Sequence, residues 1–83
     1  MKELDCVEVT VEKKRYADAG IHKGMHGWIC DKRIIEGRRL VIFPQYGENE
    51  DIATLDILEE DLMKISVMDA RVNERIRAEY GEK

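Results

Sequence analysis

Two histidines and a cysteine recur at even spacing in the middle of the chain, and a second cysteine lies near its start. The run His22-x3-His26-x3-Cys30, with Cys6 elsewhere, contains side chains that bind zinc. The spacing matches no common zinc module, since we expect the histidines in a loop and Cys30 in a strand. The alternative is a pair of exposed loop histidines and a core thiol. Both interpretations stay open, and we take the one without metal or cofactor.

The same residue types could suggest a cysteine nucleophile activated by histidine. That chemistry needs a stabilised thiolate, a third group that orients the base and a concave site that excludes water. A single domain of 83 residues offers little such concavity, so we predict that the protein is not an enzyme. The two cysteines are expected as reduced, partly buried thiols, with a disulfide between neighbouring strands as the alternative.

Basic residues interleaved with aromatic ones give the best candidate for a binding surface. They could contact phosphates and stacked bases, or an acidic protein surface. The alternative is a solvated rim that only maintains solubility. Trp28 is expected either in the core or barrel mouth, or as an interface anchor. The predicted partner-binding residues are Lys13, Lys14, Arg15, Tyr16, His22, Lys23, Trp28, Arg38 and Arg39.

Charge is unevenly distributed around a net value of −4. Residues 13–33 are mainly basic, whereas residues 48–62 contain seven carboxylates and no Lys or Arg. We therefore expect a basic end and an acidic edge. A net-acidic chain is a poor match for non-specific nucleic-acid binding, which rests on phosphate neutralisation. The acidic stretch is expected as a solvated edge that discourages strand aggregation, or as a face that meets a basic toxin or nuclease.

Short strands account for most of the chain. Val7, Val9 and Val11 alternate with polar residues, which is typical of a half-buried strand. A long connection follows, with Tyr16 and Ile21 as its apolar anchors, and a loop of that length is usually a binding loop. Strands are predicted at 6–12, 27–33, 39–43, 51–58 and 63–67, with one helical turn at 59–62.

Glycines mark the points where the chain changes direction. Gly20, Gly24 and Gly27 are predicted to need positive φ or close backbone approach. Gly37 is predicted to turn a hairpin between the second and third strands. Pro44 is expected to end the third strand, because proline cannot donate to a sheet ladder.

The C-terminal segment changes to a helical period. Met68, Val72, Ile76 and Tyr80 recur every four residues, and Ser66 with Asp69 resembles a capping box. We predict a helix over 67–80 that docks beside the strands or pairs with a second helix. The protein is accordingly expected as a monomer or a helix-mediated homodimer.

These elements predict a mainly β fold, a small five-stranded SH3-like barrel with a C-terminal α-helix. The barrel would span 1–66, and 67–80 would be a helix of the same domain.

Three motifs resemble a family of small uncharacterised bacterial SH3-like proteins: K-G-M-H-G-W-I at 23–29, R-L-V-I-F at 39–43 and I-L-E-E-D-L at 57–62. More distantly, K-G-x-x-G-x-[IV] is similar to the KOW motif of ribosomal and transcription-elongation proteins. The resemblance covers about 6–65; the first family implies no catalytic residues, and the second implies RNA or protein binding.

The leading hypothesis from the sequence is a stand-alone, non-enzymatic adaptor that recognises a protein partner. The alternatives are a KOW-like RNA-, ribosome- or transcription-associated factor, and an immunity protein that neutralises a basic toxin. No apolar run approaches the roughly 18 residues of a membrane span, so we expect no membrane insertion. The first residues lack the apolar region of a signal peptide, so the expected location is the cytoplasm.

Overall fold

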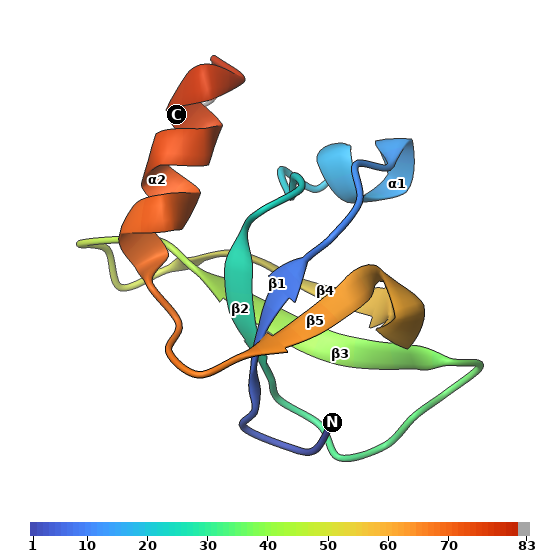
Figure 1. The fold of residues 1–83 in the computed structure, drawn as a ribbon. Coiled ribbons are helices and arrows are strands. Elements are labelled where there is room, and N and C mark those ends of the chain that lie inside the picture. The colour runs from blue at the N-terminus through green and yellow to red at the C-terminus, as the bar shows by residue number, and fades with distance from the viewer. Residues whose placement is uncertain (82–83) are drawn as a thin grey trace.

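The computed structural model describes residues 1–81, which form five antiparallel strands and two α-helices (Figure 1). The elements are β1 (Cys6–Val9), α1 (Lys14–Ala17), β2 (His26–Ile29), β3 (Arg38–Pro44), β4 (Asp51–Leu58), the 3-10 turn η1 (Glu59–Asp61), β5 (Leu62–Ile65) and α2 (Ala70–Glu79). Within the described residues, no helix is long and apolar enough to cross a membrane.

All five strands belong to one sheet with the order β4-β3-β2-β1-β5. The mainly β fold with a C-terminal helix is therefore confirmed. Strands β4 and β5 form the two edges and, over residues 1–81, do not pair with each other, so the sheet is open. The ladder between strands does not close into the barrel that the sequence predicts.

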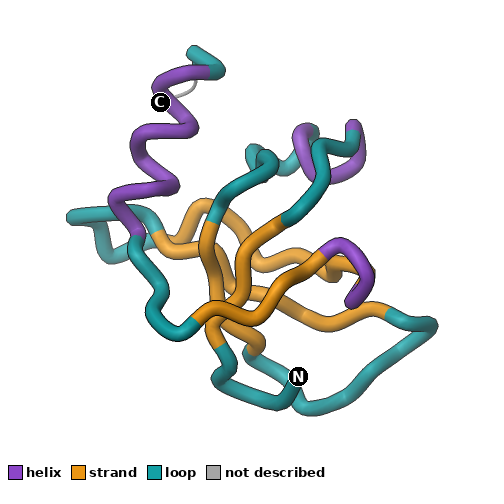
Figure 2. Tube along the Cα trace, in the orientation of Figure 1, coloured by secondary structure: helices purple, strands orange, loops and turns teal. Residues whose placement is uncertain are grey.

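The core lies on one face of this sheet. Val7, Val9 and Ile29 alternate with outward residues and are fully buried, as are Val41 and Phe43 of β3. The segment containing α1 and the helix α2 both lie over this face (Figure 2). The predicted loop anchors Tyr16 and Ile21 are confirmed, because both are fully buried in the same cluster.

Two glycine positions show why the strands can turn and pack so closely. A Cβ on Gly27 would lie 2.5 Å from the carbonyl oxygen of Ile42, so the predicted close approach is confirmed there. Glu36 and Gly37 both have positive φ, at 53° and 75°, and form the two-residue turn predicted between β2 and β3. Ile35 and Arg38 close that turn with reciprocal backbone hydrogen bonds of 3.1 and 2.9 Å.

Helix α2 begins later than its sequence pattern suggests. Asp69, not Ser66, is the N-cap, and its side chain accepts a hydrogen bond from the backbone N–H of Arg71. Ile76 is buried in the core and Val72 packs against it, so the predicted apolar stripe packs on the chain's own sheet. Asn73 is fully buried beside Ile76, and its amide bonds the backbone of His26 and Pro44.

Several predicted boundaries were wrong by a few residues. Strand β2 ends at Ile29 and not at 33, because Asp31 accepts a hydrogen bond from the Arg33 backbone N–H and turns the chain. The first and last strands are likewise shorter than predicted. The connection at 13–27 is not structureless, since Lys14–Ala17 forms α1.

Candidate interaction surface

The face of the sheet away from the core has an apolar row across four strands. Trp28 of β2 stands directly opposite Cys6 of β1 and Ile42 of β3, and Cys6 stands opposite Ile65 of β5. All four side chains are half-buried and lie outside the core cluster. We call these residues, Cys6, Trp28, Ile42 and Ile65, the outer row.

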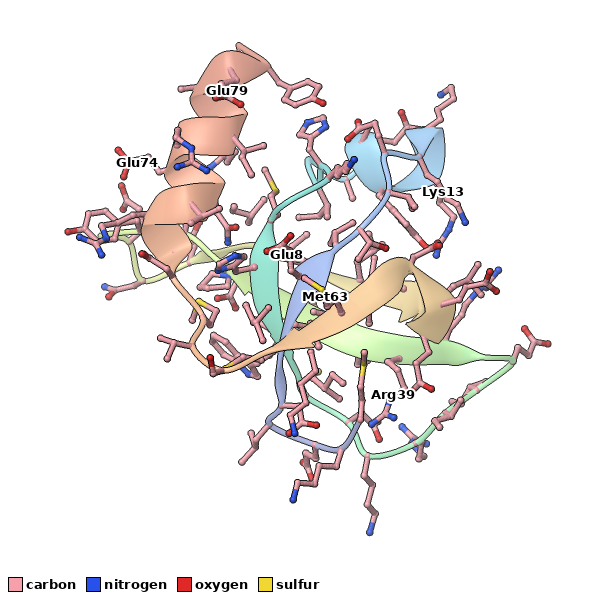
Figure 3. The ribbon with its side chains drawn as sticks, in the orientation of Figure 1. Glu8, Lys13, Arg39, Met63, Glu74 and Glu79 are labelled. Atoms are coloured by element: carbon pink, nitrogen blue, oxygen red, sulfur yellow. The ribbon has the colours of Figure 1, made fainter. Side chains whose placement is uncertain are left out.

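Further apolar side chains extend the outer row along the strands. Leu40 of β3 is 36% exposed and Met63 of β5 is 47% exposed. Met63 pairs with Glu8, and the two lie side by side on β5 and β1 (Figure 3). An apolar surface of this kind, bordered by charges, is typical of an interaction site.

A hollow of about 190 Å³ opens at the β3–β4 side of this face. Ile35 and Leu40 supply its apolar lining, and charged side chains form the rest. The complete lining is Asp31, Arg33, Ile35, Glu36, Arg38, Leu40 and Asp56. A space of this size accommodates one apolar side chain of a partner.

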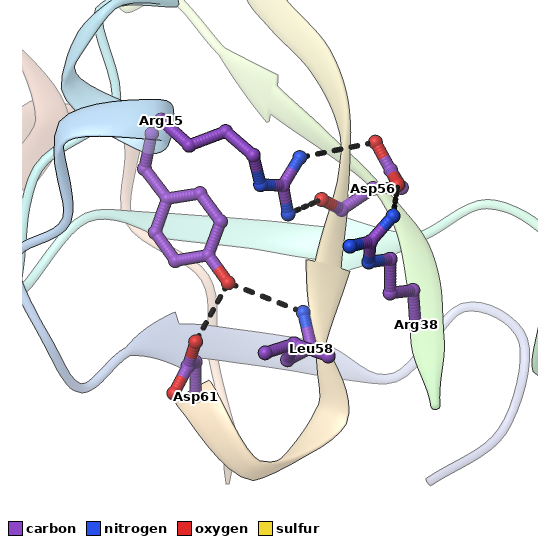
Figure 4. A network of polar contacts seen from close by, with 6 residues as sticks. Arg15, Arg38, Asp56, Leu58 and Asp61 are labelled. Atoms are coloured by element: carbon purple, nitrogen blue, oxygen red, sulfur yellow. Dashed lines mark hydrogen bonds and ion pairs between the residues drawn. The ribbon is translucent and has the colours of Figure 1, made fainter. Parts of the chain in front are cut away.

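The arginines of the hollow are paired with carboxylates. Arg33 lies 2.6 Å from Asp31, and its hydrogen bonds lower the pKa of that carboxyl to about 2. Arg38 lies 3.4 Å from Asp56, which also binds Arg15 of α1 (Figure 4). Because the arginine charges are balanced in this way, the hollow presents no strong positive field to a phosphate.

The predicted basic end and acidic edge meet at two ion pairs. Lys13 bonds Asp61 at 2.6 Å and Arg15 bonds Asp56, while Arg39, outside the basic stretch, bonds Glu59 at 3.0 Å. Charge is therefore less separated at this contact than the sequence suggests. The two stretches are far apart in the sequence and meet because α1 packs beside the end of β4.

Three of the predicted binding residues are buried. Tyr16 is fully buried and His22 and Arg39 are 3% and 1% exposed, so none of them can touch a partner in this structure. The Nη1 of Arg39 donates to the Met1 carbonyl and to Glu59, while its Nε and Nη2 have no hydrogen-bond partner among residues 1–81.

The other predicted residues lie on different parts of the surface. Lys14 and Lys23 are exposed, and Lys14 pairs with Asp18, four residues further along the chain. Lys13, Arg15 and Arg38 are partly exposed but bound to carboxylates. Trp28 is the predicted residue that lies at the centre of an apolar surface. The side chain of the next residue, Ile29, is the one that lies in the core.

The two histidines hold the structure together and are not exposed in a loop. The His22 ring stacks on Tyr80 with centroids 3.6 Å apart, and its Nδ1 lies 2.8 Å from Glu12. Partial burial raises the pKa of Glu12, but hydrogen bonds from the Lys23 backbone and from His22 outweigh it and hold that pKa below its usual value.

His26 lies in β2 and joins three segments. Its Nδ1 accepts a hydrogen bond from the Asp69 backbone N–H at 3.1 Å, which assigns its proton to Nε2, 3.2 Å from Glu8.

Cys6 and Cys30 are both free and half-buried, as predicted for reduced thiols. Burial raises the pKa of the Cys30 thiol, opposite to what a nucleophile needs. Over residues 1–81, no three His, Cys, Asp or Glu side chains are grouped to hold a metal ion.

Sequence reasoning missed most of the outer row. In their own strands, Cys6, Ile42 and Ile65 alternate with the buried core residues, so their side chains point to the other face of the sheet. The four residues form one row only when the four strands are placed in their order and register, which the sequence does not show.

The chain matches no protein-family model, no curated protein and no solved structure in comparisons with all three.

Proposed function

We propose that this protein is a non-enzymatic SH3-like adaptor of the bacterial cytoplasm that binds a partner protein through the outer face of its sheet. The observation that carries the proposal is the apolar outer row with Trp28 at its centre. Tryptophan is among the residues enriched at the energetically dominant centres of protein interfaces. The partner segment is extended and apolar, with one side chain in the hollow beside Leu40.

The charge pattern around the outer face favours an apolar peptide over a nucleic acid. Arg15, Arg33 and Arg38 are paired with carboxylates and would have to leave them to contact phosphates. The same pairs count against a purely acidic toxin-binding edge, because Asp56 and Asp61 are already neutralised by cations of this chain. The KOW-like and immunity alternatives therefore rank below the adaptor.

Selection from a displayed library of random peptides tests this function. We expect enrichment of apolar peptides whose affinity falls at least about tenfold in Trp28→Ala and in Leu40→Lys. Lys14→Ala is the matched control, since its side chain is exposed and lies in the basic segment. Peptides that bind Trp28→Ala as well as wild type, or that lose binding only in Lys14→Ala, would contradict the proposal.

Salt dependence separates the nucleic-acid alternative. Binding of the apolar peptides should change little between about 50 and 200 mM salt, whereas contacts to several phosphates weaken by orders of magnitude over that range. RNA that binds tightly at low salt, loses its affinity steeply and is insensitive to Trp28→Ala would favour the KOW-like alternative.

A further inference from the structure

Strand β4 is an edge of the sheet with one side of its backbone unpaired. Its register with β3 places Val41 opposite Leu55 and Arg39 opposite Ile57. The contacts made by α1 show which groups point outward: Arg15 Nη2 donates to the Asp56 carbonyl at 2.6 Å, and the Leu58 N–H donates to the Tyr16 hydroxyl at 3.3 Å. Even-numbered residues of β4 therefore direct their backbone groups away from the sheet.

Helix α1 contacts this edge through Arg15, whose guanidinium bonds to Asp56 (Figure 4). By the same alternation, the backbone N–H and C=O of Thr54 point away from β3. Within residues 1–81, no hydrogen bond to either group is found. Thr54 is also exposed. The register shift beside Phe43 and Pro44 bends the start of β4, so the straight, open part of the edge runs from 53 to 56.

This open part lacks the usual protection of an edge strand. Natural edges carry lysine, proline or inward charges that prevent pairing with another strand. Here Ala53, Thr54 and Leu55 are uncharged, and the Asp56 carboxylate is neutralised by Arg15 and Arg38. The edge is therefore suited to accept one more antiparallel strand.

We propose that the strand it accepts is β4 of a second copy of this chain, paired antiparallel about Thr54. The two Thr54 residues then exchange N–H···O=C bonds across the two-fold axis. The Asp56 carbonyl already accepts a hydrogen bond from Arg15, so the pairing ends at this residue in each copy. The result is one continuous ten-stranded sheet.

Charge complementarity supports a second copy as the occupant. An antiparallel pair brings the acidic start of one β4, Glu50 and Asp51, toward the end of the other. At that end Arg15 and Arg38, each about two-fifths exposed, share the single carboxylate of Asp56, so one positive charge is left over there. Glu50 and Asp51 are exposed at the surface. Each copy thus offers both halves of the same complementary pair, as a two-fold interface requires.

Sedimentation equilibrium of the full chain over a wide range of concentrations tests this pairing. The wild type should approach twice the mass of one chain as concentration rises. Thr54→Pro removes the outward N–H without breaking the ladder to β3, and it should raise the dimer dissociation constant at least about tenfold. Thr54→Val, the matched control, keeps the N–H and should dimerise like wild type.

Thr54→Lys gives a second readout if Thr54→Pro does not fold, as judged by circular dichroism. It places two like charges opposite each other and should also abolish the dimer. A wild type that stays monomeric at every concentration would overturn the proposal, and so would a folded Thr54→Pro or Thr54→Lys protein that dimerises normally. Peptide binding by the Trp28 face is separate from this edge and should survive Thr54→Pro, so the two proposals can fail independently.

Discussion

The hydroxyl of Tyr16 lies 2.6 Å from Oδ2 of Asp61, and this buried bond joins the first loop to the turn before β5. The same carboxylate oxygen accepts from Lys13 at 2.6 Å. The same hydroxyl accepts from the Leu58 N–H, as Figure 4 shows. A residue expected to bind a partner is therefore a structural anchor. It fixes α1 against the edge strand.

Removing that hydroxyl should destabilise the fold. Tyr16→Phe leaves the buried Asp61 carboxylate with one bond fewer and the Leu58 N–H without its acceptor. We expect a loss of about 1–3 kcal/mol in the free energy of unfolding, measured by urea denaturation. Tyr46→Phe, at a side chain that is 54% exposed, should change it by less than about 0.5 kcal/mol. Equal effects of the two substitutions would show that the Tyr16 bond is not structural.

Asp61 should make stability depend on pH in the acid range. Burial raises its pKa, but hydrogen bonds from Lys13 and Tyr16 outweigh burial and set the pKa below its usual value. A depressed folded pKa means that the stabilisation is complete above the unfolded pKa of about 3.9 and is lost as pH falls through the folded value. Asp61→Asn should therefore lower stability at pH 7 and flatten its fall between about pH 5 and 2.

Asp31 provides the control for that experiment. Hydrogen bonds from Arg33 are the main cause that lowers its pKa to about 2. Arg33 is exposed and lies only two residues further along the chain. A local pair of this kind can form in the unfolded chain too, and a shift shared by both states adds no stability. Asp31→Asn should leave the pH profile nearly unchanged. A profile altered equally by both substitutions would contradict this assignment.

Asn73 should be essential for docking of α2. Its Oδ1 accepts from the His26 N–H at 2.7 Å, and its Nδ2 donates to the carbonyls of His26 and Pro44 at 2.8 and 3.0 Å. Asn73→Ala leaves all three buried groups unsatisfied, so we expect a loss of about 2–4 kcal/mol and faster amide exchange in α2. Arg75→Ala, on the exposed side of the helix, should have almost no effect.

Gly27 should tolerate no side chain. The 2.5 Å approach of a Cβ to the Ile42 carbonyl involves backbone, which cannot swing aside as a flexible side chain can. Gly27→Ala should separate β2 from β3 and cost several times more stability than Gly47→Ala, whose Cβ meets nothing within 4 Å but has φ of 74°. Thermal unfolding of both variants measures the difference, and similar melting temperatures would contradict it.

The local pattern of the sequence was enough to place the strands and the core. Alternation identified Val7 and Val9 as inward, and the spacing of Gly27 and Gly37 identified a close approach and a turn. These features depend on neighbours in the sequence. The N-cap was misplaced because Ser66 and Asp69 both suit that position, and only the bond to Arg71 distinguishes them.

The candidate site could not be derived in the same way, because it depends on contacts between distant residues. Lys13 and Asp61 are 48 residues apart, so nothing local shows that the basic loop neutralises the acidic stretch. Trp28 could be singled out as the sole tryptophan, but its face of the sheet follows from its register with Cys6 and Ile42. Burial of His22 and Arg39 likewise follows from packing that only the three-dimensional arrangement supplies.

The most direct test of the adaptor function is site-specific photo-crosslinking in living cells of the native host. Trp28→p-benzoylphenylalanine places the reactive group at the centre of the outer row, and the same substitution at Lys14 places it on the exposed basic helix. The adaptor proposal predicts a discrete protein adduct from position 28, unaffected by nuclease and absent from position 14. An adduct that forms only at position 14, or one that disappears on nuclease treatment, would contradict it.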